Sequence, residues 1–236
     1  PWDTNISPRM DVLVHDEALR ALARSGRISF AWMGTPSRSL TLARKPALRS
    51  VGLPMGKLGL TREQRELVSL GNSLALFCVS FIGELMTVAS LWALESPHRS
   101  YLWLLPLVLM LSQMDGVGFV HFAMKSFGTL YLKPTVLLTN VPQLLRLRQP
   151  VPCYASPFVL RGQIFYEGMW QFMTALACAY PTVLGEMVGE IVSEALSERT
   201  AAISRGESVR MMLPEEDMGN PMLQALFDKE ENLLGN

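Results

Sequence analysis

Cysteine and histidine are scarce in this sequence, with three residues of each among 236. Cys78, Cys153 and Cys178 form no C-x-x-C motif and no spacing typical of a metal site, and two of them lie in apolar runs. We therefore expect no disulfide framework and interpret the cysteines as small apolar residues. The three histidines do not offer two axial ligands at a common depth for a haem, so no cofactor is predicted.

Motifs for nucleotide binding are also missing, because the chain has neither a P-loop nor a dinucleotide-binding fingerprint. Gly71-Asn-Ser-Leu-Ala75 resembles the nucleophile elbow of hydrolases. An elbow requires a strand before it, whereas Thr61-Arg-Glu-Gln64 matches a capping box that would begin a helix through this stretch. The sequence therefore favours a non-catalytic protein over an enzyme.

Acidic residues are absent between Ala18 and Thr61, although the whole chain balances 21 acidic with 21 basic residues. Eight arginine and lysine residues fall in this acid-free range, which has the composition of an organelle transit peptide. We predict a basic N-terminal arm over residues 1–60, with one short helix that ends at Arg24.

The other end of the chain is acidic. From Glu198 to Asn236, eight acidic residues accompany four basic ones. A short apolar stripe follows Asn220-Pro221 in this region, which is typical of a helix that docks on another protein. We therefore predict an acidic docking tail over residues 199–236.

Two long apolar segments, Leu67–Leu94 and Tyr101–Met124, dominate the middle of the chain. Each is longer than the ~20 apolar residues with which a helix crosses a bilayer. Only the six polar residues 95–100 separate them. The pattern predicts a transmembrane helical hairpin over residues 61–125.

The second half of the chain continues this pattern less clearly. Residues 126–162 are rich in proline and contain no acid, which predicts a basic loop. Gln163–Gly185 is a third apolar run, predicted to be a third span, with a buried or surface-lying helix as the alternative. Over residues 163–198 this segment is expected to continue into an acidic amphipathic helix.

These observations predict an all-α integral membrane protein with short amphipathic helices in its terminal arms. An alternative is a soluble helical protein with a very apolar core. The basic regions flank the predicted hairpin on one side, and the acidic tail lies on the other. By the positive-inside rule we expect the basic arm on the matrix side of the mitochondrial inner membrane.

Ionisable residues within the predicted spans are candidate functional residues. Glu84 and Asp115 fall at similar depths if the two spans are antiparallel, so they could form a proton relay, a cation site or a structural polar contact. His121 and Glu167 could meet near the basic side as an ion pair. These four residues are the predicted intramembrane polar site.

Arginines near the predicted membrane surface are candidate lipid ligands. Arg146, Arg148 and Arg161 could bind cardiolipin or another anionic lipid headgroup, or they could only set the topology. No metal site and no nucleic-acid partner is predicted.

We therefore expect a non-catalytic accessory subunit of a large organellar membrane complex, such as the respiratory chain or ATP synthase. Its partners would be other subunits of that complex and anionic lipids. The alternative hypothesis is a small transport or proton-conducting protein that uses Glu84 and Asp115.

Overall fold

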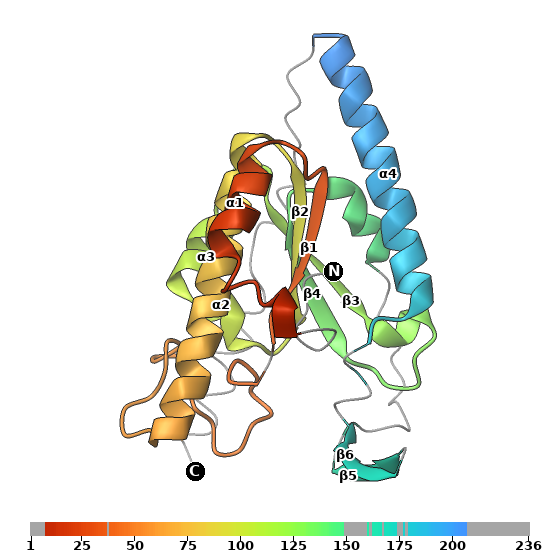
Figure 1. Cartoon of the computed structure of the whole chain (residues 1–236). Coiled ribbons are helices and arrows are strands. Elements are labelled where there is room, and N and C mark those ends of the chain that lie inside the picture. The colour runs from red at the N-terminus through yellow and green to blue at the C-terminus, as the bar shows by residue number, and fades with distance from the viewer. Residues whose placement is uncertain are drawn as a thin grey trace. The chain divides into compact units, whose positions relative to one another are not determined.

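A computed structural model describes residues 8–36, 38–148, 160, 162–166, 168–173, 177 and 179–206. It contains 46% helix and 18% strand. Four strands form a mixed sheet in the order β1 (Phe30–Gly34), β2 (Leu91–Pro97), β4 (Pro134–Thr139) and β3 (Gly118–Ala123), and two more, β5 (Gln163–Tyr166) and β6 (Met169–Phe172), form a separate hairpin (Figure 1). The prediction of an all-α membrane protein with a transmembrane hairpin is therefore wrong.

The described residues divide into two compact units, 8–119 with 137–142 and 120–136 with 143–206. In the first unit, helix α2 contacts α1, α3 and strand β2. The elements that lie within this unit, with η for a 3-10 helix, are η1 (Pro8–Met10), α1 (Asp16–Arg24), β1 (Phe30–Gly34), α2 (Arg62–Thr87), β2 (Leu91–Pro97), η2 (Tyr101–Leu104) and α3 (Pro106–Ser112).

The remaining elements follow from β3 onward. The boundary between the two units passes through β3 and β4. These elements are β3 (Gly118–Ala123), η3 (Met124–Phe127), β4 (Pro134–Thr139), η4 (Pro142–Leu147), β5 (Gln163–Tyr166), β6 (Met169–Phe172) and α4 (Thr182–Ser204). Within the second unit, α4 contacts η3.

Helix α2 begins where the sequence predicts it. The Thr61 hydroxyl accepts a hydrogen bond from the Gln64 backbone N–H at 3.3 Å, and the Gln64 side chain accepts one from the Thr61 N–H at 3.0 Å. This confirms the capping box. The helix ends at Thr87 rather than Leu94, because Ala89 has a left-handed φ of 54° that a continuing helix cannot include.

The rest of the first apolar segment is strand β2, which pairs in parallel with β1. Phe30 lies opposite Leu91, and Gly34 lies opposite Glu95. Residues 91–96 are all buried. A short strand that is buried on both faces has no alternating pattern, so its apolar run is indistinguishable from the end of a buried helix.

The second apolar segment is three short elements, η2, α3 and β3, instead of a membrane span. Pro106 occupies the first turn of α3, and Gly116 adopts a φ of 76° in the turn that follows the helix. These two residues break the predicted helix. The segment is apolar because it belongs to the protein core, where Trp103 and Phe122, for example, are at most 2% exposed.

The third apolar run, Gln163–Gly185, contains the β5-β6 hairpin and the start of α4 instead of one long helix. Residues 163–172 form the β5-β6 hairpin, with Gly168 at a φ of 80° in its turn. Pro181 immediately precedes α4, so a helix begins at the place where the predicted span would have ended.

The stretch predicted to be an acidic amphipathic helix after this run lies within α4. Glu186, Glu190 and Glu194 are exposed, whereas Ile191 and Ala195 are buried. The predicted docking segment beyond Gly206 lies outside the described residues.

Among the described helices, α2 alone is long and apolar enough to cross a membrane. Of its most apolar window, 39% is buried within the protein. A core helix satisfies the same length and composition test, and α2 packs against α1, α3 and β2.

Candidate binding site

A buried arginine, Arg49, connects the segment before α2 to the helix itself. Its side chain is 0% exposed. The guanidinium donates five hydrogen bonds, to the main-chain oxygens of Ser39 (2.9 Å), Pro54 (2.6 Å) and Val68 (3.1 Å), the Asn72 Oδ1 (2.7 Å) and the Ser39 Oγ (3.0 Å). All five acceptors are neutral oxygens, so dipoles and not a carboxylate stabilise the charge.

Burial lowers the pKa of Arg49 to about 10, so the side chain is still protonated at neutral pH. A buried cation costs several kcal/mol unless all of its donors are satisfied. The planar guanidinium can direct five donors into one site, which an ammonium cannot do. Arg49 therefore fixes the positions of the groups around it.

Gly71 and Asn72 of α2 accommodate Arg49. A Cβ atom at Gly71 would lie 3.0 Å from the Arg49 Nη2 and closer still to the Ser39 Oγ. Asn72 accepts from Arg49 and donates from its Nδ2 to the Met55 main-chain oxygen at 2.9 Å. The Gly71–Ala75 stretch that resembles a nucleophile elbow is thus helical, as predicted. Gly71 leaves space for Arg49, and Asn72 accepts a hydrogen bond from it.

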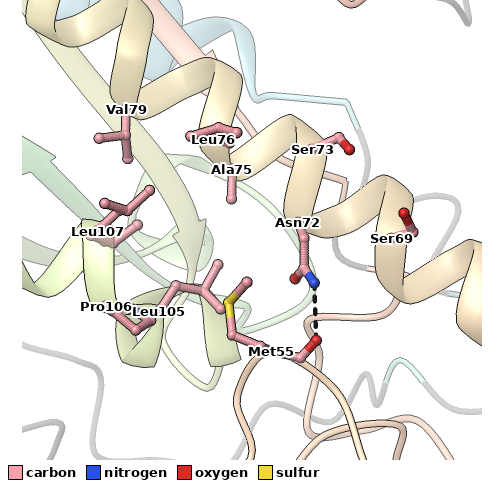
Figure 2. Close-up of a pocket in the computed structure, with 11 residues that line it drawn as sticks. Met55, Ser69, Asn72, Ser73, Ala75, Leu76, Val79, Leu105, Pro106 and Leu107 are labelled. Atoms are coloured by element: carbon pink, nitrogen blue, oxygen red, sulfur yellow. Dashed lines mark hydrogen bonds between the residues drawn. The ribbon is translucent and has the colours of Figure 1, made fainter.

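A mainly apolar pocket of about 390 Å³ lies beside this cluster, between α2 and the start of α3. Figure 2 shows the α2 side chains facing residues 105–107 across the opening, with Met55 near one end. Residues 105–108 and Met55 line it together with six residues of α2: Ser69, Asn72, Ser73, Ala75, Leu76 and Val79.

The pocket has a buried floor and an exposed apolar rim. Ala75, Leu105 and Val108 are at most 5% exposed, whereas Met55 and Leu76 are 51% and 53% exposed. A pocket of a few hundred Å³, apolar with a few polar groups, is the usual form of a ligand or anchor site. Asn72 in the pocket wall accepts a hydrogen bond from Arg49 and donates one to the Met55 main-chain oxygen.

Two exposed cations are close in sequence to residues that line the pocket. Arg65 is one helical turn before Ser69 and hence on the same face of α2, and its Nη1 donates to the Leu60 oxygen at 2.5 Å. Lys57 follows Met55 by two residues. Arg65 therefore gives the pocket-lining face of α2 a basic end, at its N-terminal side.

The structure gives the predicted intramembrane residues different surroundings. The Glu84 carboxylate pairs with Arg24 at 2.9 Å, and Asp115 is exposed in the turn after α3. Hydrogen bonds to Glu17 and Glu84 raise the pKa of Arg24. His121 is half-buried on β3, and Glu167 lies outside the described residues. The two antiparallel spans that were to bring Glu84 and Asp115 together are absent from the described fold.

The predicted lipid-binding arginines are likewise separate from the pocket residues. Arg146 pairs with Glu194 of α4, Arg148 is exposed, and Arg161 lies outside the described residues. No group of three His, Cys, Asp or Glu side chains suited to a metal ion occurs in the described part of the chain.

Comparison of the chain with models of protein families, with curated proteins and with solved structures finds no match.

Sequence reasoning missed the Arg49 cluster and the pocket. The sequence predicts Arg49 to be one basic residue of the N-terminal arm, because neutral main-chain acceptors leave no pattern in a sequence. One local signal is the Gly71-Asn72 pair inside the helix, because a glycine there costs ~1 kcal/mol relative to alanine.

We predict that Arg49→Lys lowers the free energy of unfolding by at least ~2 kcal/mol. Lysine has three donors, so at least two of the five acceptors would lose their partners, at about 1–3 kcal/mol for each buried group. Arg38→Lys, at an exposed position of the same segment, should change it by less than ~0.5 kcal/mol. Urea unfolding measures both, and equal midpoints for the two variants would contradict the role of Arg49.

Two glycines of α2 should respond oppositely to alanine. Gly71→Ala should destabilise the protein by at least ~1 kcal/mol, because the new methyl group overlaps Ser39 and Arg49. Gly83→Ala should stabilise it by about 0.5–1 kcal/mol, since nothing lies within 4 Å and alanine favours the helix. Thermal unfolding followed by circular dichroism tests this, and a stabilised Gly71→Ala variant would overturn the packing described.

Proposed function

We propose that the protein is a non-catalytic accessory subunit of a larger assembly and that the α2–α3 pocket binds a partner chain. The observation that carries the proposal is an open apolar pocket whose rim residues, Met55, Leu76 and Leu107, are 43–53% exposed. Large side chains that gather around a concavity on a surface are typical of an interaction site.

An amphipathic helix is the partner element that fits this pocket best. Such helices insert apolar side chains spaced by three and four residues into a groove between other elements. Ser69, Asn72 and Ser73 can accept or donate hydrogen bonds on the α2 side, and Arg65 favours an acidic residue on the incoming helix. We therefore propose an apolar helix with an acidic flank.

The setting of this assembly is a further proposal. The acid-free composition of residues 18–61 favours an organelle such as the mitochondrion, although α1, β1 and the Arg49 cluster make this range part of the fold. We propose respiratory-chain or ATP-synthase subunits of its inner membrane, and anionic lipids, as partners. The transport alternative depended on Glu84 and Asp115 facing each other within a hairpin, and no contact of either residue now favours it.

Leu76→Asp should reduce partner capture by the tagged full chain at least tenfold, because a carboxylate would face the apolar pocket. Leu70→Asp is the matched control, since Leu70 is a 48% exposed residue of the same helix that does not line the pocket. Native co-purification with quantitative mass spectrometry provides the measurement.

The comparison requires that both variants unfold at the same urea concentration as the unmodified chain. Partners retained equally by Leu76→Asp and Leu70→Asp would show that the pocket is not the binding site.

A further inference from the structure

The acidic C-terminal segment of this chain has the chemistry that the α2–α3 pocket is proposed to bind. We propose that residues 221–234 occupy the pocket within the same molecule and compete there with the partner. This inference rests on the proposed function of the pocket, and it names an internal occupant and hence a form of regulation.

The segment carries apolar side chains at helical spacing. Leu223, Leu226 and Phe227 recur at intervals of three and four residues after Asn220-Pro221, which is a typical helix start. Leu234 continues the same face. These residues lie outside the described part of the chain, so the argument uses their sequence alone together with the pocket geometry.

The lengths of the segment and the binding face agree. The α2 face from Arg65 to Val79 covers fourteen residue steps, or ~21 Å of helix axis. A helix over residues 222–234 would be ~20 Å long by the same rise per residue. Its apolar stripe can therefore extend along the pocket and its basic end together.

The charges of the two surfaces are complementary. Asp228, Glu230 and Glu231 accompany the apolar stripe, with Lys229 as the one base among residues 221–234. Arg65, on the α2 face that lines the pocket, and Lys57, two residues after Met55, are both exposed.

Two carboxylates close in sequence to Arg65 already have partners. Glu66 pairs with Arg62 at 3.0 Å, and Glu63 accepts from the Thr61 hydroxyl at 2.8 Å. Arg65 and Lys57 thus remain the cations best placed to attract an acidic helix.

The connecting chain gives the segment a long reach. Fourteen residues, 207–220, lie between the last described residue and this segment, and they can span up to ~50 Å when extended. A short tether within one molecule would give an effective concentration on the order of mM, so even a weak contact would be populated.

Disulfide trapping in the full chain tests the proposal. Cys153→Ser and Cys178→Ser remove two native thiols, and Cys78 can remain because it is 7% exposed and burial raises its pKa to about 12. Ser73→Cys in the pocket is combined with Leu226→Cys in the segment. Leu70→Cys with Leu226→Cys is the matched control on the outer face of α2.

Under copper–phenanthroline oxidation at micromolar protein, we expect the Ser73→Cys pair to form an intramolecular disulfide at least ten times faster than the control pair. Adding Leu107→Asp should reduce this rate to that of the control. Intact-mass and peptide mass spectrometry distinguish intramolecular from intermolecular bonds.

Equal rates for the two pairs would overturn the proposal, and disulfide-linked dimers alone would assign the pocket to a second copy instead. If trapping fails while partner capture still depends on Leu76, only the internal occupant is wrong. If trapping succeeds while capture is unaffected by Leu76→Asp, the pocket binds its own segment and the proposed partner function fails.

Discussion

Removing a guanidinium from water costs several kcal/mol, and all five acceptors of Arg49 are uncharged. The protein meets this cost by assembling main-chain and side-chain oxygens from three places, namely the Ser39 region, Pro54 and helix α2. Each acceptor restricts the position of the chain that supplies it. The interaction therefore acts as a positional constraint on residues 39–56, which contain no helix and no strand of the sheet.

Helix α2 packs in the core with one face and lines the pocket with another. Its buried face, which includes Phe81 and Ile82, contributes to the core of the first unit, whereas Leu76 lies exposed on the pocket rim. Asn72 connects the two roles, because it accepts from Arg49 and holds Met55 at the opening. A change in the Arg49 cluster should therefore affect stability and pocket shape together.

Local features of the fold could be predicted from the sequence, but its long-range pairing could not. The capping box at Thr61 and the acidic face of α4 depend on residues within one or two turns, and both were found. The strand at 91–97 was missed because burial on both faces removes the alternation that marks a strand. Pro106 and Gly116 were the available signals against a continuous second helix, and their weight was underestimated beside the apolar composition.

The candidate site was harder to predict, because its parts come from distant places in the chain. Arg49, Asn72 and Leu105 are brought together only by tertiary packing, and main-chain acceptors such as the Pro54 oxygen have no residue-type signature. The membrane hypothesis for Glu84 arose because a half-buried carboxylate on a core helix has the same sequence context as one in a span. Its partner, Arg24, lies 60 residues away.

The central claim is that Arg49 and Asn72 act as one unit that holds the pocket wall. A double-mutant cycle with Arg49→Gln and Asn72→Ala, measured by urea unfolding, tests it most directly. A hydrogen bond to a charged group contributes about 1.5–3 kcal/mol, so we predict a coupling free energy of at least ~1.5 kcal/mol. Additive effects of the two substitutions, within ~0.5 kcal/mol, would contradict the account.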